Sequence, residues 1–281
     1  KSSSALVAAL SDLSVKGSGT FANNVVKINT GTIGFRGQTI SASGTYALPK
    51  KEGQRPVIDF TVKADKLNVD ELTGTVSKVT GGTGNSETAK KSDSAAPTGM
   101  SLPFDGHLSA SIGSLVTGGK TYSPLNADIV SKGNALTINS LNVGIASGTT
   151  LTAKGRVGNL SALSDFDLTA SGQTADADAL MKALAIEKPA ALTQKIGAAS
   201  LNGTAKGSLD KVAFNGTVNA LRFAVTGQGT VETPMTSPVI NSLQLNVKHA
   251  QFSEAIRTFQ PGFQAPPSFN GPLDLSTVVA W

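Results

Sequence analysis

The chain has 281 residues and a net charge of +5, with 39% apolar, 15% charged and 5% aromatic residues and no cysteine. The lack of cysteine excludes disulfides, thiolate metal sites and a cysteine nucleophile. Low charge together with abundant glycine, threonine, valine and asparagine indicates many strands and turns, not a disordered chain. The longest basic runs, Lys50-Lys51 and Lys90-Lys91, are short and lack aromatic neighbours, so we expect no nucleic-acid partner.

No apolar run approaches the ~18 residues that span a bilayer; the longest near the start covers residues 5–10. The sequence begins without Met or a signal-peptide pattern. We therefore interpret it as a fragment of a longer protein that has lost any anchor or targeting segment.

The first part of the chain alternates apolar and polar residues with period two, which predicts half-buried strands. Residues 1–10 have the composition of a helix end, and separate alternating runs follow at 13–21, 26–28, 33–35 and 40–48. Gly31, Gly37 and Gly53 are the predicted turns between runs. A further strand covers residues 57–64. Residues 75–100 have almost no apolar content and predict a flexible loop.

The second part continues in the same way. Strands are expected near 104–112, 121–131, 135–145, 149–157 and 162–171, with a hairpin turn at residues 132–134. Ala175 to Ile186 predicts a helix that ends at Pro189. Short runs broken by glycines fill residues 196–247, followed by a short helix from Phe252 to Phe259 and a last strand from residue 273.

One strand-to-helix corner occurs three times. Its copies are Phe60–Ala64 followed by Asp70-Glu71-Leu72, Phe166–Ala170 followed by Asp176–Met181, and Leu243–Val247 followed by Glu254-Ala255-Ile256. Three copies of one corner predict a repeat array. The predicted boundaries are repeat 1 at 1–74, a flexible loop at 75–100, repeat 2 at 101–190, repeat 3 at 191–262, and the start of a truncated repeat 4 at 263–281.

Strands joined by links this short are antiparallel neighbours, since a parallel crossover needs a dozen or more residues. Their alternation gives one apolar and one polar face. An apolar face of several strands must pack on a second sheet, close into a barrel, or curl around something apolar. The apolar positions are often Ala, Val or Gly, which favours a groove whose interior is left open. Between Ile138 and Leu141 the apolar phase shifts by one residue, which either a tight turn or a bulge would produce.

Several runs resemble the C-terminal region of AsmA-type proteins. They are residues 17–21, 33–48 and 63–72, echoed by 136–155 and 176–184, and the likeness covers most of the chain outside the loop at 75–100. The resemblance implies a Gram-negative envelope protein anchored in the inner membrane by an N-terminal helix, with the rest in the periplasm. It also implies a long twisted β-sheet with an apolar groove, similar to TamB and the bridge-like lipid-transfer proteins, that carries phospholipid between membranes.

Residues with the chemistry of an active site are few. His107 and His249 fall in different repeats, and we interpret both as strand-surface residues, not metal ligands or bases. Asp176 and Asp178 are interpreted as helix-start residues, because anionic side chains favour that end.

Two segments resemble phosphate-binding motifs but depart from them. Residues 113–121 have one residue too many for a P-loop and run into a strand pattern. Residues 17–22 match a dinucleotide fingerprint but lack a βαβ context. The sequence therefore predicts no enzyme, no cofactor and no metal site.

The fold prediction is a mainly β protein: an elongated, twisted antiparallel sheet built from repeats and curled into an apolar groove, with short helices between units. The functional prediction is a lipid conduit in which phospholipid acyl chains are the partner and the groove is lined by alternate strand residues. These are Phe60, Val62, Ala64, Phe166, Leu168, Ala170, Leu243, Leu245 and Val247. The alternative is a structural or interaction β-array, such as an outer-membrane assembly scaffold or adhesin-like module, with no lipid cargo.

Overall fold

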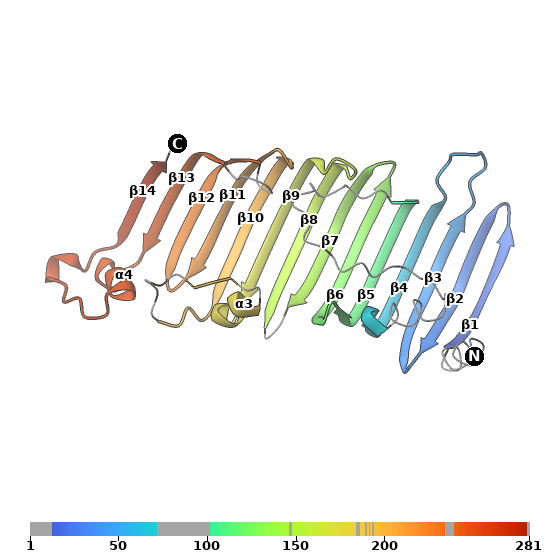
Figure 1. Ribbon diagram of the computed structural model, residues 1–281, viewed down its shortest axis with the longest axis horizontal. Helices are drawn as coiled ribbons and strands as arrows, with labels where there is room; N and C mark the ends of the chain where they lie inside the picture. The colour runs from blue at the N-terminus through green and yellow to red at the C-terminus, as the bar shows by residue number, and fades with distance from the viewer. Residues whose placement is uncertain are drawn as a thin grey trace, which may run out of the picture. The chain divides into compact units, whose positions relative to one another are not determined.

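The computed structural model describes residues 13–71, 102–145, 148–183, 186–188, 190, 192, 194–233 and 239–279. These residues form a mainly β protein whose strands follow one another in a single mixed sheet that is not closed into a barrel, with a few short helices (Figure 1). The predicted β-sheet with short helices is thereby confirmed. The predicted helix end at 1–10 and loop at 75–100 lie outside the described residues.

The chain divides into two compact units, Lys1–Val143 and Gly144–Trp281, called the N-terminal and C-terminal units below. This division follows compactness and not sequence repetition, so the four predicted repeats and their boundaries stay predictions.

In the N-terminal unit every strand follows its neighbour in sequence. The strands are β1 (Leu13–Ala22), β2 (Val25–Phe35), β3 (Gln38–Ala47), β4 (Val57–Asn68), β5 (Asp105–Thr117), β6 (Lys120–Lys132) and β7 (Ala135–Ile145). Antiparallel pairing joins β1 to β2, β2 to β3, β3 to β4 and β5 to β6. The pair β4–β5 is parallel, so the prediction of a wholly antiparallel sheet was wrong there. Residues 69–104 separate these two strands, which leaves ample chain for a crossover.

The changes of apolar phase in this unit are not turns, and the one in β2 is a bulge. The runs predicted at 26–28 and 33–35 form the single strand β2, whose pairing with β3 shifts register between Ile28 and Gly31. The turn predicted at Gly31 was therefore wrong, whereas Gly37 and Gly53 lie in turns with φ of +74° and +80°. Ile138 and Leu141 both lie within β7, which excludes a tight turn between them.

The C-terminal unit continues with antiparallel strands and carries two helices. Its elements are β8 (Thr149–Asn159), β9 (Ser164–Thr174), α3 (Ala177–Ala183), β10 (Ala199–Ser208), β11 (Lys211–Ala220), β12 (Phe223–Glu232), β13 (Val239–His249), α4 (Phe252–Phe259), the 3₁₀ helix η1 (Pro267–Phe269) and β14 (Leu273–Val279). Figure 1 shows α3 and α4 along the same edge of this unit's strands, α3 after the end of β9 and α4 after the end of β13. The helix predicted at 252–259 is confirmed, and the one predicted at 175–186 is helical from 177 to 183.

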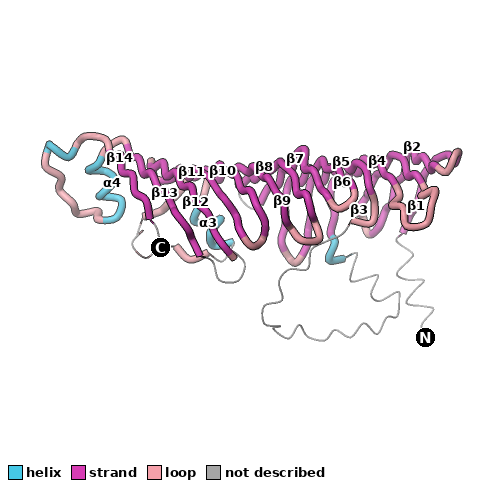
Figure 2. The backbone as a smooth tube through the Cα atoms, turned by 90° about the horizontal axis from the view of Figure 1, so that it is seen from above, coloured by secondary structure: helices cyan, strands magenta, loops and turns pink. Residues whose placement is uncertain are grey.

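Very little of the protein is buried. Figure 2 shows the strands of each unit in one layer, and no second sheet covers either unit among the described residues. No described side chain is fully buried, and large apolar side chains such as Val15, Phe21 and Val278 are 64–70% exposed. A filled sandwich or closed barrel of this length would bury many of them. The two alternatives of a second sheet and a closed barrel are thus excluded for the described part of the chain.

Candidate functional site

The strand register sorts the side chains of the N-terminal unit onto two faces. Residues directly opposite each other on paired strands point to the same face. Phe60 lies opposite Gly44 and Leu108, and Val62 opposite Ala42 and Ala110. Ala64 follows the same pattern, opposite Ile40 and Ile112. These residues make one continuous apolar face across β3, β4 and β5.

The opposite face of the same strands is mainly polar. Thr61 lies opposite Ser43 and Ser109, and Lys63 opposite Ser41 and Ser111. Hydroxyl and amide side chains also bond across the strands, as Ser111 Oγ does to Asn126 Oδ1 at 2.8 Å. Water can solvate this polar face. The free energy cost of a sheet with no covering layer therefore comes only from the exposed apolar side chains of the other face.

The C-terminal unit has the same division. In β9, Leu168 lies opposite Gly155 and Ala205. In β13, Val247 lies opposite Val225 and Leu275. The register therefore places each predicted triplet of lining residues on the apolar face of its own unit. Ala64 is buried, Ala170 is exposed and the other seven are half-buried. Contact of these side chains with lipid stays a prediction.

A row of small residues crosses the apolar face of each unit at right angles to the strands. The sequence predicts small apolar residues on the strands, but their alignment depends on the register of every strand pair. The N-terminal row consists of Gly17, Gly31, Ala42, Ala110 and Ala127, interrupted by the larger Val62 between Ala42 and Ala110. The C-terminal row consists of Ala153, Ala170, Gly203, Gly216 and Gly227.

Larger apolar residues flank both rows. Beside the N-terminal row, Val15, Ile33, Ile40 and Ile112 follow one another across the strands, interrupted by the small Ala64 between Ile40 and Ile112. Beside the C-terminal row lie Leu201, Val218, Val225 and Val247. A Cβ added to Gly203 or Gly216 would lie 3.0 Å from a carbonyl oxygen of the neighbouring strand, so backbone packing also favours glycine there. Together these residues give each apolar face a strip of small residues with larger apolar side chains along one side.

Two hollows open on the apolar faces. The N-terminal hollow, of about 520 Å³, is formed by β1–β3 alone and includes Val15, Phe21 and Ile33. The C-terminal hollow, of about 500 Å³, lies between the strands β11–β14 and α4 and includes Val225 and Phe259. Both volumes fall in the range of small-molecule sites, about 300–1,000 Å³.

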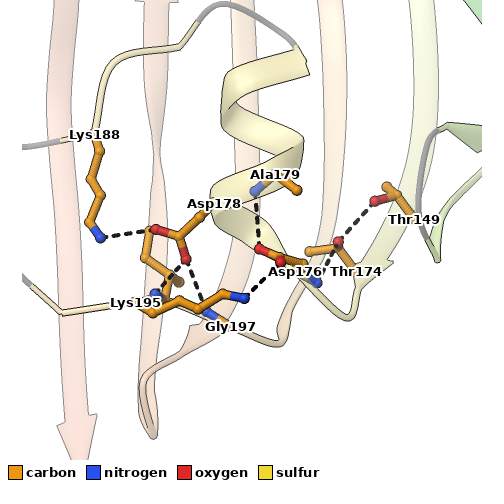
Figure 3. A network of polar contacts seen from close by, with 9 residues as sticks. Thr149, Thr174, Asp176, Asp178, Ala179, Lys188, Lys195 and Gly197 are labelled. Carbon is orange, nitrogen blue, oxygen red and sulfur yellow. Dashed lines mark hydrogen bonds and ion pairs between the residues drawn. The ribbon is translucent and has the colours of Figure 1, made fainter.

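Asp176 and Asp178 hold the second corner together. Asp176 Oδ1 accepts the Ala179 N–H at 3.0 Å, which confirms its place at the helix start (Figure 3). Its other oxygen binds Lys195 Nζ at 2.8 Å, and Asp178 binds Lys188 Nζ at 2.9 Å. Each lysine, as the main cause, lowers the pKa of its partner carboxyl. Both carboxylates are committed to these structural bonds and do not form an acid–base pair.

The glycine-rich segment at 113–121 is a β-hairpin. Gly118 and Gly119 form its turn with φ of +57° and +69°. Their backbone N–H groups donate to the two oxygens of Asp70 at 2.8 and 2.9 Å, and these bonds lower the pKa of that carboxyl. A side chain of the protein thus occupies the donors that a phosphate would need. Residues 17–22 lie within β1, which confirms that they are not a dinucleotide fingerprint.

The two histidines occupy different environments. His107, on the polar face, lies 3.1 Å from Asp59 and 3.2 Å from Asp128, and hydrogen bonds to these carboxylates, Asp59 first, raise its pKa. The surface position predicted for His249 was wrong. His249 is 4% exposed and its ring centroid lies 4.6 Å from that of Phe223. It ends β13 on the apolar side, where the chain turns into α4 and covers it.

Neither a metal site nor a membrane-spanning helix is found among the described residues. No group of three or more His, Asp or Glu side chains there is arranged to hold a metal ion. No helix in the described ranges is long and apolar enough to cross a membrane.

Comparisons of the chain with protein-family models, with curated proteins and with solved structures find no match. The likeness to AsmA-type proteins therefore rests on the sequence runs that carry it, and family membership enters below as a proposal.

Proposed function

We propose that this chain is the periplasmic part of an AsmA-like protein anchored in the bacterial inner membrane. In this proposal it carries phospholipid along its apolar faces between the inner and outer membranes and so supports outer-membrane homeostasis. The observation that carries the proposal is an apolar face in each unit that stays largely uncovered among the described residues, with only α4 lying over part of the C-terminal one. Monomers rarely leave more than a few hundred Å² of contiguous apolar surface in water, so such a face calls for an apolar occupant.

The small-residue rows suggest how an acyl chain would lie. A flexible hydrocarbon placed along Gly203, Gly216 and Gly227 would touch backbone and low side chains beneath it and larger apolar residues beside it. Burial of this kind is non-directional and depends on area, so no single position along the row binds much more tightly than the next. The chain could slide from strand to strand while its charged head group stays in water.

The test is site-specific photo-crosslinking of the full chain with matched positions on the two faces. A photoreactive residue replaces Val62 or Leu168 on the apolar faces, and Thr61 or Thr169, their sequence neighbours, on the polar faces. The protein is incubated with phosphatidylethanolamine vesicles, and lipid adducts are identified by mass spectrometry. Adducts at Val62 and Leu168 but not at the two threonines are expected.

A carboxylate introduced on one face or the other provides a second test. Leu168→Glu places a carboxylate on the apolar face, whereas Thr169→Glu places one on the polar face. We expect the first variant to lose most of its bound lipid and the second to keep it, because an ion cannot lie against hydrocarbon without a large desolvation cost. Absence of lipid adducts at all four positions would instead favour the structural β-array without lipid cargo.

A further inference from the structure

The C-terminal hollow differs from the rest of the apolar faces because it has two walls. One wall is the sheet, where Val218, Val225 and Val247 lie side by side in the register. The other is α4, whose Ala255, Ile256 and Phe259 line the same space. Phe259 is 51% exposed although its ring lies only 6.0 Å from that of Phe223. The helix therefore faces the sheet without filling the space between them.

Several bonds hold α4 at this distance from the sheet. Arg222, in the turn between β11 and β12, binds Glu254 of α4 at 2.7 Å. The Phe252 N–H donates to the Gly271 carbonyl at 2.8 Å, just before β14. At its other end, Arg257 Nε donates to the Phe263 carbonyl at 3.1 Å. The first turn of α4 is thus tied to the turn before β12 and to the residues before β14, while its last turn is tied to the loop that follows it.

A ligand between two apolar walls loses water contact on both sides. The gain in free energy grows with the apolar area removed from water, so an acyl chain here is held more strongly than one on an open face. Arg222, beside the lining residues Leu221 and Phe223, is 75% exposed in its side chain. A guanidinium has five N–H donors and keeps donors for a phosphate while bonded to Glu254. A phospholipid matches both the apolar walls, through its acyl chains, and the remaining guanidinium donors, through its phosphate.

We propose that the C-terminal hollow is a holding site for one phospholipid acyl chain, with the lipid phosphate at Arg222. This inference rests on the proposed function and adds to it a position where lipid pauses. Elsewhere the acyl chain lies against one wall and exchanges quickly; between α4 and the sheet it exchanges slowly.

The experiment compares two phenylalanines, each lining one hollow. Phe259 lines the C-terminal hollow and Phe21 the N-terminal hollow, and both are more than half exposed, at 51% and 64%. Each is replaced in the full chain by p-benzoylphenylalanine. The protein is loaded from phosphatidylglycerol vesicles, chased with unlabelled vesicles and irradiated at intervals. We expect the lipid adduct at position 259 to decay at least tenfold more slowly than that at position 21.

Variants of single residues distinguish loss of the holding site from loss of lipid carriage. With a fluorescent phosphatidylglycerol as probe, Phe259→Gln and Arg222→Gln should each abolish the slow phase of release, while Lys211→Gln, which removes an exposed charge outside the hollow, should keep it. Equal decay at positions 259 and 21, with adducts at both, would overturn the holding site and leave lipid carriage intact. No lipid adduct at either position would overturn both.

Discussion

The two hollows have nearly the same volume but differ in what surrounds them. The N-terminal hollow is a depression in a bare sheet, and its lining Phe21 and Val15 are 64% and 70% exposed. The C-terminal hollow has α4 across it, and beside it His249 and Ala255 are buried. One short amphipathic helix thus turns an open apolar face into a two-walled site, without any change in the sheet beneath.

The two units also fix their corners by different interactions. In the N-terminal unit, residues 69–71 are tied by polar bonds from Gln38 and to the turn at Gly118 and Gly119. In the C-terminal unit α4 adds aromatic contacts to its polar ones, Phe223 with Phe259 and Phe252 with Phe269. In the C-terminal unit these aromatic contacts place α4 over the sheet.

The largest effect is expected from Phe223→Ala. This substitution removes the ring that packs on His249 at 4.6 Å and faces Phe259 at 6.0 Å. We expect a loss of about 2 kcal/mol in the free energy of unfolding, less than for a fully buried phenylalanine because Phe223 is half-buried. Urea denaturation followed by circular dichroism measures it. Phe21→Ala, on the open face, should cost below about 0.5 kcal/mol; equal losses would mean that α4 adds no packing.

A smaller effect is expected at the N-terminal corner from Gln38→Ala. Gln38 is 6% exposed, its Oε1 accepts the Asn68 N–H at 2.6 Å and its Nε2 donates to Glu71 at 2.9 Å. Loss of these bonds should destabilise the protein by about 1 kcal/mol. Hydrogen exchange at Asn68 should accelerate in parallel. The exposed neighbour Thr39 serves as control, and a Gln38→Ala protein as stable as Thr39→Ala would show that the polar tie contributes nothing.

Arg222→Ala tests the ion pair that crosses from the sheet to α4. Because the Arg222 side chain is 75% exposed, we expect a loss of only about 0.2–1 kcal/mol, declining as salt is added. Thermal unfolding at low and high ionic strength measures it, with Lys211→Ala, which breaks the exposed pair with Glu232, as the matched control. A loss of several kcal/mol, unaffected by salt, would contradict this assignment.

The smallest effect is expected from the pH dependence of His107 on the polar face. Its pKa is raised above 6.5 in the folded protein, so the stability it contributes is full below pH 6.5 and is lost as pH rises through the raised value. His107→Gln should therefore lower the unfolding midpoint at about pH 5.5 and change it little at about pH 8.5. Unfolding curves at the two pH values measure the difference. A larger effect of the variant at the higher pH would reverse the assigned sign.

Much of the secondary structure was predictable because alternation and turn residues act locally. The helix at 252–259 and the strands from 104 to 171 follow from apolar periodicity within single segments. The bulge in β2 was missed because a change of phase after Ile28 has the same pattern as a turn, and only the partner strand decides between them. The parallel pair β4–β5 could not be deduced from the short links that govern its neighbours.

The sequence by itself determined that this is a sheet protein with one apolar and one polar face, since period-two alternation places every second side chain on the same side. It also placed an acidic residue at each corner. Tertiary structure alone decided which residues line up across strands, because the small-residue rows depend on the register of each pair. The tertiary structure alone also determined that His249 is buried and that α4 lines the hollow together with Val225. Both depend on where α4 folds back after β13.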